Sequence, residues 1–347
     1  MLDYIIVGCG LGGIAFCETA LNNNKKILII NNDVENSSKI AAGLYNPVIL
    51  KRFSQVWHAS EQLILLNTYY KNLEYKLNVK LDYKLPIHRK LVNIEEQNNW
   101  YLATDKPNVG EYLSSKLLQT KNRYLNNPFG FGEVLQTGYV DTQRLLMHYK
   151  KYLELNNNYL HEKFEHSKLE NHENYVQYKN IKARHVVFAE GFGARHNPFF
   201  SYLPIDGTKG EIITIKAPDL KVNEIINSSI YLIPLGANFY KIGATYNWED
   251  KSSEPTENGK NELLHNINNL ITCDFEIIAH SAGIRPTVKD RRPLIGTHQI
   301  YKRYHILNGL GTRGVMLAPE MAHHLYNHIE NETELDNHIN IIRYADK

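Results

Sequence analysis

The chain has 347 residues, of which 43% are hydrophobic and 22% charged, so it can bury a large core and is long enough for two domains or one domain with an elaborated insert. Its 39 basic and 37 acidic side chains give a formal net charge of +2, which makes no global electrostatic case for binding nucleic acid or an acidic membrane. Three scattered cysteines predict neither a disulfide framework nor a metal site. No Lys or Arg precedes Lys25, and no apolar run approaches the roughly 18 residues that span a bilayer, so we expect a cytoplasmic protein without a signal peptide or membrane segment.

The N-terminal stretch has the order strand, glycine turn and helix that a dinucleotide site requires. An apolar strand is predicted over Tyr4–Val7, a helix over Ile14–Leu21 and a second strand over Lys26–Ile30. In the turn, Gly8 permits a tight bend, Gly10 lets the backbone approach a pyrophosphate, and Gly13 lets helix and strand pack closely. The helix N-terminus also presents unpaired N–H groups to an anion. We therefore predict that the dinucleotide is bound by Gly8, Gly10, Leu11, Gly12 and Gly13.

After the second strand the chain departs from the usual pattern. The carboxylate that normally binds the adenosine ribose is replaced by Asn31, whose amide can still bond a hydroxyl, and Asn32 and Asp33 are neighbouring candidates. The next segment, residues 41–47, reads Ala-Ala-Gly-Leu-Tyr-Asn-Pro. Its small side chains permit either close approach of the backbone to a flat or bulky ligand or a tight packing turn, and the residues alone leave both readings open.

The middle of the chain alternates between helical and strand-like patterns. Helices are predicted over Ser60–Asn78, Asp141–Leu155 and Lys260–Ile271. Strands are predicted over Leu85–Ile94, Trp100–Ala103, Ile181–Glu190, Glu211–Lys216, Ser229–Pro234, Phe239–Thr245 and Phe275–Ala282. The Ile181 strand ends at Glu190-Gly191, and the carboxyl end of a strand is where open α/β sheets bind ligands.

The C-terminal section repeats the logic of the N-terminus. A strand over Tyr304–Leu307, a glycine turn over residues 308–314 and a helix over Val315–Glu330 again aim a helix N-terminus at the edge of a sheet. Both turns are therefore expected to fold around one extended ligand. On the last helix, His323, His324 and His328 with Glu320 suggest either a metal or a solvated face, and we expect the solvated face.

Taken in order, these motifs resemble the FAD-dependent D-amino-acid oxidase-like (DAO) superfamily, near glycine oxidase and the FAD domain of the bifunctional tRNA-uridine modification enzyme. The matching segments are residues 8–13, 41–47, 186–193, 231–234, 243–245, 283–286 with Asp290 and Pro293, and 309–319. The resemblance implies an α/β fold in which a doubly wound, Rossmann-like FAD-binding domain (residues 1–80, 138–205 and 283–347) carries an inserted antiparallel β-rich substrate domain (residues 81–137 and 206–282).

The same resemblance implies a set of cofactor contacts. No cysteine matches the family's covalent flavin attachment near Arg285, so FAD should be bound non-covalently. Beyond the N-terminal turn, the implied contacts are Asn31, Asn32, Ser38, Ala42, Gly43, Leu44, Phe164, Ala189, Glu190, Gly191, Gly309, Leu310, Gly311, Thr312, Arg313, Gly314, Val315 and Met316. For Phe164, contact with adenine competes with an ordinary core role.

Five residues are candidates for the chemistry. Arg285 would clamp a substrate carboxylate in bidentate fashion, or instead bridge the domains. Lys241, in a Lys-Ile-Gly run like that of sarcosine oxidases, would promote reaction with oxygen, unless it points to solvent. Arg313 with the helix N-terminus would stabilise reduced flavin, or lie on the surface. Tyr231 and Tyr246 would line the pocket or pack in the core. Met316 stands where sarcosine oxidase has its carboxylate-binding lysine, which argues against sarcosine as the substrate.

The leading hypothesis is an FAD-dependent oxidoreductase that oxidises the C–N bond of a small amine, amino acid or N-substituted glycine and passes electrons to oxygen or another acceptor. One alternative is oxidation of a carboxymethylaminomethyl group on the wobble uridine of tRNA, which needs a basic surface around the pocket. The candidate contributors to that surface are Lys51, Arg52, Arg89, Lys90, Lys289, Arg291 and Arg292. The other alternative is an FAD-holding subunit without amine oxidase activity.

Overall fold

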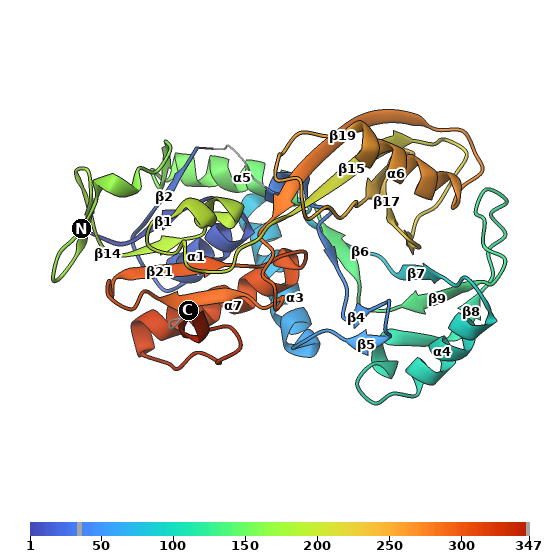
Figure 1. Ribbon diagram of the computed structural model, residues 1–347, viewed down its shortest axis with the longest axis horizontal. Helices are drawn as coiled ribbons and strands as arrows, with labels where there is room; N and C mark the ends of the chain where they lie inside the picture. Colours follow the sequence, from blue (N-terminus) through green and yellow to red (C-terminus); the bar gives the residue numbers. More distant parts are fainter. Residues whose placement is uncertain (33–36, 345–347) are drawn as a thin grey trace.

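The computed structural model describes residues 1–32 and 37–344, so the predicted ribose candidate Asp33 lies outside the described residues. Figure 1 shows two lobes: one contains both chain termini and several helices around a sheet, and the other is dominated by strands. The domain boundaries given above remain a prediction, because the arrangement of sheets does not fix them to a residue.

A mostly parallel sheet forms the centre of the lobe that contains the termini. Its strand order is β11 (Tyr159–His161), β2 (Ile27–Asn31), β1 (Leu2–Val7), β14 (Ile181–Phe188), β13 (Val176–Tyr178) and β12 (Leu169–Asn171), with β21 (Tyr304–Asn308) paired to β14 and β20 (Leu294–Thr297) paired to β21. The pairs β11–β2, β2–β1, β1–β14 and β14–β21 are all parallel. The strands from the two ends of the chain therefore finish at the same edge of one sheet.

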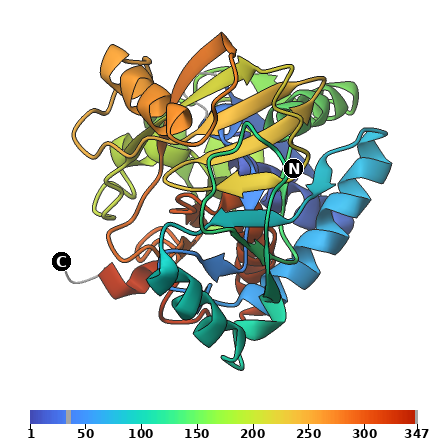
Figure 2. The same ribbon diagram turned by 90° about the vertical axis from the view of Figure 1, so that its right-hand side faces the viewer.

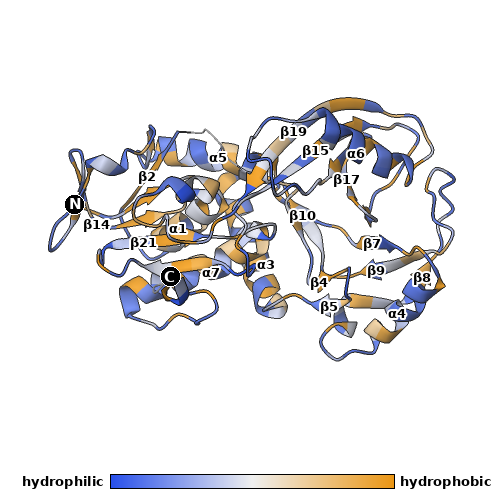
Figure 3. Cartoon of the chain, viewed as in Figure 1, coloured by the Kyte–Doolittle hydropathy of each residue, from blue (hydrophilic) through white to orange (hydrophobic). Residues whose placement is uncertain are grey.

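Both faces of this sheet are buried, as its apolar strands predict. Along β1, Tyr4 and Ile6 belong to one core cluster, whereas Ile5 and Val7 belong to another on the opposite face. The first cluster includes residues of α1 (Leu11–Asn22), α3 (Ala59–Leu77), α5 (Thr142–Leu155) and α7 (Gly314–Asn331). Helices α1 and α7 contact each other, which brings the first and last helices of the chain together. Figure 3 shows the apolar residues gathered along the elements at the centre of this lobe.

The second lobe, which faces the viewer in Figure 2, contains a largely antiparallel sheet. Its order is β19 (Glu276–Arg285), β15 (Thr208–Lys216), β18 (Phe239–Gly243), β17 (Tyr231–Gly236), β16 (Ile225–Asn227), β7 (Ile87–Lys90), β9 (Phe131–Val134) and β8 (Leu113–Leu118). On one face, Ile213 and Ile215 of β15 share a core cluster with Leu263 and Ile267 of α6 (Glu257–Asn268). The alternate residues of β15 therefore point to the other face, where the candidate site lies.

The remaining elements are short. These are α2 (Ser37–Ile40), the three-stranded sheet β3 (Leu44–Tyr45), β10 (Gly138–Val140) and β6 (Asp82–Lys84), the hairpin β4 (Val48–Ile49) and β5 (Ser54–Gln55), and the 3-10 turns η1 (Gly110–Tyr112), η2 (His166–Lys168), η3 (Gly191–His196) and η4 (Ile341–Tyr344). None of the helices in the described part of the chain is long and apolar enough to cross a membrane.

One predicted strand is wrong. Trp100–Ala103 lies inside helix α4 (Ile94–Thr104), and the predicted strand before it shortens to β7. The helix begins because the Asn93 side chain accepts a hydrogen bond from the Glu96 backbone N–H at 2.7 Å, with acidic residues in the first turn. Trp100 is fully buried and its indole N–H donates to the Ser114 carbonyl at 3.0 Å. The residue types at 100–103 suggested a strand, whereas Asn93, three residues before Glu96, is the capping signal that indicates a helix.

Candidate active site

A cavity of about 1100 Å³ lies where the two sheets meet. Its lining includes the three glycine-bearing segments at the carboxyl ends of β1, β14 and β21. The opposite wall includes Gly210, Ile212 and Tyr231 from the second sheet. The cavity therefore has one wall suited to a nucleotide and another that belongs to the β-rich lobe.

The two glycine turns bring a pair of helix N-termini to this cavity. Gly8 has φ 103°, and a Cβ there would lie 2.4 Å from the Ala189 carbonyl oxygen. A Cβ on Gly314 would lie 3.1 Å from Leu11 Cδ1, so the first turns of α1 and α7 touch. The residues at the N-cap positions, Gly10 and Arg313, make no side-chain capping hydrogen bond. The partial positive charge of both helix ends therefore faces the cavity, as binding of one anionic, extended ligand requires.

Most of the predicted cofactor contacts line this cavity. They are Gly8, Gly10, Leu11, Gly12, Asn31, Asn32, Ser38, Ala42, Gly43, Leu44, Phe164, Ala189, Glu190, Gly191, Gly309, Leu310, Gly311, Thr312, Arg313, Gly314 and Val315. The predicted residues that do not line it are Gly13, Met316 and, among the catalytic candidates, Lys241. Gly13 packs against the strand, since a Cβ there would lie 2.0 Å from the Gly8 carbonyl oxygen, and Met316 is fully buried on α7.

Several predicted contacts also stabilise the turns around them. The Asn31 amide oxygen accepts from the Cys9 backbone N–H at 3.2 Å, and its NH₂ group donates to the Tyr159 hydroxyl at 3.1 Å. Ser38 Oγ accepts from the Leu11 backbone N–H at 3.3 Å. Phe164 is buried and stacks on Tyr178 with ring centroids 4.3 Å apart, so a core role and a place on the cavity wall coexist. Asn31 is thus a support of the glycine turn.

The small-residue run 41–47 has both of the roles that the sequence left open, close approach of the backbone to a ligand and a tight packing turn. Ala41, Ala42 and Gly43 line the cavity, so the backbone does approach the ligand space there. Gly43 has φ 70°, and a Cβ at this position would lie 1.9 Å from the Val140 carbonyl oxygen, so the same residues also form a tight packing turn.

Arg285 lies at the end of β19, with its guanidinium in the cavity wall. Both terminal nitrogens are 3.4 Å from the Thr245 carbonyl oxygen, and the guanidinium carbon is 5.2 Å from the centre of the Tyr246 ring. Within residues 1–32 and 37–344 no carboxylate lies within 4.0 Å of it. Burial lowers the pKa of Arg285, and the nearby Tyr246 opposes that shift. An arginine with weak neutral partners and no counter-ion is prepared to bind a carboxylate.

Gly210 makes room for this arginine. A Cβ on Gly210 would lie 1.9 Å from Nη2, 2.3 Å from Cζ and 2.4 Å from Nη1 of Arg285. A glycine fits here because the Arg285 side chain fills the space that a Cβ would take. No turn at Gly210 calls for a glycine, since its φ is not positive.

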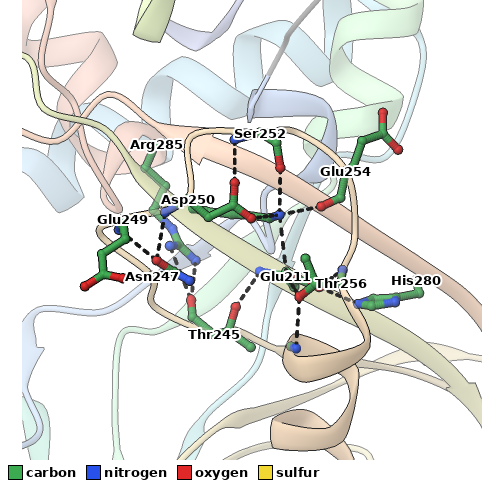
Figure 4. Close-up of polar contacts among 12 residues, drawn as sticks. Glu211, Thr245, Asn247, Glu249, Asp250, Ser252, Glu254, Thr256, His280 and Arg285 are labelled. Carbon is green, nitrogen blue, oxygen red and sulfur yellow. Dashed lines mark hydrogen bonds and ion pairs between the residues drawn. The ribbon is translucent and has the colours of Figure 1, made fainter.

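The residues on either side of Gly210 tie the loop that follows β18 to the sheet (Figure 4). Lys209 Nζ, on a side chain only 1% exposed, donates to Asp250 Oδ2 at 2.6 Å, to Ser252 Oγ at 3.1 Å and to the Glu254 carbonyl. The buried Glu211 carboxylate accepts from Thr256 at 2.7 and 2.9 Å and lies 2.8 Å from His280 Nε2. These contacts hold the loop that begins at Thr245 and Tyr246, and therefore the partners of Arg285.

The remaining catalytic candidates differ in their surroundings. Tyr231 lines the cavity; burial raises its pKa, and a hydrogen bond with Asn46 opposes the shift. Arg313 lines the cavity at the N-terminus of α7, and burial lowers its pKa, with the charges of Arg292 and Arg291 acting in the same direction. Lys241 lies opposite Ile233 in the β17–β18 pair, two residues before the cavity-lining Gly243; burial lowers its pKa. Its predicted role toward oxygen remains a prediction.

Sequence reasoning missed Lys209, Gly210 and Glu211. A detectable signal was present, because two charged residues around a glycine interrupt an otherwise apolar strand, and such residues are buried only when they are paired. On the last helix, Glu320 is 3.0 Å from His58 and 3.7 Å from His324. Among all the residues that the structure describes, no group of three His, Cys, Asp or Glu side chains is arranged to hold a metal ion.

A parallel sheet with two adjacent glycine-lined helix N-termini, facing a second sheet that holds Arg285, is the arrangement of a nucleotide-binding protein with a second wall at its cavity. The chain matches the model of the FAD dependent oxidoreductase (DAO) family over residues 3–327, and it belongs to that family. Its cofactor is therefore FAD, and the glycine turns, the uncapped helix ends and the cavity between them fit that molecule.

Curated relatives match a part of the chain. The glycine oxidase of Bacillus subtilis (strain 168) is 26% identical over 147 residues, which are 40% of this chain and 39% of that protein. The tRNA 5-methylaminomethyl-2-thiouridine biosynthesis bifunctional protein MnmC of Idiomarina loihiensis is 24% identical over 126 residues, which are 35% of this chain and 20% of that protein. The chain thus aligns with about two fifths or less of the length of these relatives.

Solved structures match nearly the whole fold. Glycine oxidase from Bacillus cereus ATCC 14579 has a TM-score of 0.80 at 20% identity, with 96% of each chain covered. Iminodiacetate oxidase from Chelativorans sp. BNC1 also has a TM-score of 0.80, at 16% identity, with 97% of this chain and 98% of that chain covered. At these identities the likeness establishes the Rossmann-like FAD-binding fold with its β-rich second sheet, and no substrate.

Proposed function

We propose that this FAD-dependent oxidoreductase oxidises the C–N bond of a small amino acid or N-substituted glycine, with transfer of a hydride equivalent to flavin N5. The observation that carries the proposal is Arg285, whose guanidinium lines the cavity without a carboxylate partner among the described residues. The similarity to glycine oxidases over two fifths of the chain supports the same class of substrate.

The residues of the chain would bind and orient the substrate. Arg285 would hold the carboxylate through two parallel N–H donors, which fixes the direction of the Cα–H bond. Tyr246 and Thr245, whose loop is tied down by Lys209, would keep the guanidinium in place. Arg313 and the N-terminus of α7 supply positive charge to the same cavity. Bound FAD supplies the hydride acceptor. Oxygen or another acceptor as the final oxidant, and a cytoplasmic location, remain predictions.

The substitution Arg285→Ala tests the proposal. We expect the variant to retain FAD but to lose about 10²-fold or more in kcat/KM for carboxylate-bearing amines, since a positioned charge–charge contact is removed. Steady-state rates and the FAD content of the purified variant give both readouts. Unchanged turnover in a variant that still holds FAD would exclude Arg285 as the clamp.

A second candidate function is oxidation of a modified uridine in tRNA. The observation in its favour is that Lys51, Arg52, Lys289 and Arg291 are exposed, and none has a carboxylate within 4.0 Å in the described ranges. Against it, Arg89 is bound to Glu96 at 2.7 Å and Lys90 lies 3.3 Å from a backbone carbonyl, so this part of the predicted basic surface is occupied. A salt-dependent gel shift with unmodified tRNA would reveal such a surface. An FAD-holding subunit would show no flavin reduction by any amine.

A further inference from the structure

Three arginines lie on two neighbouring loops, and two of them belong to the cavity lining. Arg291 and Arg292 follow β19, and Arg313 caps α7. The loops are joined, because the Gly311 N–H donates to the Pro286 carbonyl at 3.3 Å and a Cβ on Gly309 would lie 2.8 Å from Val288. Arg291 and Arg313 both line the cavity. Arg291 and Arg313 thus bring positive charge to the cavity lining in addition to that of Arg285.

This charge is not neutralised by the protein. No carboxylate of the described residues lies within 4.0 Å of any of the three guanidinium groups. The neighbouring acid, Asp290, is used by Arg343 at 3.2 Å and by the Tyr344 hydroxyl at 2.8 Å. Arg292 lies with its guanidinium carbon 4.8 Å from the centre of the Trp57 ring, which orients it without cancelling its charge. Burial lowers the pKa of Arg313, and the charges of Arg292 and Arg291 act in the same direction.

Like charges held close together are stabilised by a bound anion, and arginines prefer planar carboxylates or phosphate-type groups. A carboxylate on the carbon that is oxidised already has Arg285 as its partner. The pyrophosphate of the cofactor is assigned to the first glycine turn. A further anion near Arg291 and Arg313 would then come from another part of the substrate, which in an N-substituted glycine is the substituent on nitrogen.

We propose that Arg291 and Arg313, with Arg292 beside them, form a second anion site, which binds an acidic group on the nitrogen substituent of the substrate. The inference rests on the proposed function and narrows its substrate class to N-substituted glycines with a carboxylate, phosphonate or phosphate on the substituent. Arg313 also faces the helix end assigned to the flavin, so Arg291 is the residue whose loss isolates the second site.

The test compares two substrates of similar size on the FAD-loaded enzyme, iminodiacetate with an anionic substituent and N-propylglycine with a neutral one. We expect kcat/KM to favour iminodiacetate by about tenfold or more, the effect of one charge-assisted contact. In Arg291→Gln this preference should shrink about tenfold while N-propylglycine oxidation is unchanged. Lys289→Gln is the matched control: it removes an exposed charge two residues away that does not line the cavity, and it should retain the preference.

The second site would be overturned if wild-type enzyme and Arg291→Gln preferred iminodiacetate over N-propylglycine to the same degree. It would also be overturned if the wild-type enzyme oxidised N-propylglycine faster than iminodiacetate. If no amine reduces the flavin, the proposed function fails, and calorimetric titration of the FAD-loaded protein with iminodiacetate still decides the inference. Binding that weakens about tenfold in Arg291→Gln would support the site. Absence of iminodiacetate binding, with tRNA binding that depends on Arg291, would overturn it.

Discussion

Adding one methyl group beside the proposed substrate clamp, in Gly210→Ala, tests the geometry of Arg285 without removing its charge. The new Cβ would lie 1.9 Å from Nη2 of Arg285, whereas ordinary contacts begin near 3.4 Å. The guanidinium must therefore move by about 1.5 Å. The backbone of β15 does not need to move, because the atoms in the way are the end of a flexible side chain and Gly210 is not among the residues with positive φ. We therefore expect the fold and FAD binding to survive.

The catalytic cost follows from the displacement. A 1 Å error in the position of a reacting or binding group costs about 10²-fold in rate, so kcat/KM for glycine or an N-substituted glycine should fall by roughly that factor. An amine without a carboxylate does not use the clamp and should be oxidised at the wild-type rate, however slow. Anaerobic stopped-flow measurement of flavin bleaching with both kinds of amine provides the comparison.

Gly193→Ala is the control for Gly210→Ala. Gly193 also lines the cavity, its φ is not positive, and an added Cβ would lie 3.9 Å from the nearest atom, so we expect flavin reduction to stay within about twofold of wild type. If Gly210→Ala reduced its flavin with carboxylate substrates as fast as Gly193→Ala, the placement of Arg285 against Gly210 would be refuted.

Three further predictions concern residues around the site. Lys209→Met removes the buried ammonium that pairs with Asp250 at 2.6 Å and lies 3.7 Å from Glu211, and it should lower the free energy of unfolding by about 3 kcal/mol. Lys251→Met removes a more exposed pair with Asp206 and should cost under about 1 kcal/mol; equal losses in urea titrations would contradict this. His305 Nε2 lies 3.0 Å from His185 Nδ1, and burial lowers the pKa of His185 to about 4 and that of His305 well below its ordinary value. Both folded pKa values lie below the unfolded value of about 6.5, so the contribution of these histidines to stability is fully present above that pH and is lost as pH falls towards 4. The free energy of unfolding should therefore be lower at pH 5 than at pH 7, and the difference should be smaller in His305→Gln. Lys241→Met should reduce its flavin normally and reoxidise more slowly in oxygen; equal reoxidation rates would remove Lys241 from the reaction.

The cofactor wall could be predicted from the sequence because its signals are local. The turn at Gly8–Gly13 and the turn at 308–314 each lie between a strand and a helix within about twenty residues, and both strands belong to the same parallel sheet. Backbone geometry and helix ends determine such a site, so the residue types reveal it without tertiary contacts.

The substrate wall was harder because its contacts join distant segments. Arg285 was found through a motif, but its neighbours Gly210, Thr245 and Tyr246 come from β15 and the loop after β18, and only the pairing of β15 with β18 and β19 brings them together. The second arginine group likewise depends on the meeting of two loops. Trp100–Ala103 shows the opposite error, since a local aromatic pattern was outweighed by the cap at Asn93 and by burial of Trp100.

The most direct test of the account is anaerobic mixing of the FAD-loaded protein with a panel of amino acids and N-substituted glycines, followed by flavin absorbance. The account predicts that at least one carboxylate-bearing amine bleaches the flavin and that Arg285→Ala, still yellow, is not bleached by it. A protein that binds FAD but stays fully oxidised with every member of the panel would contradict the proposed chemistry.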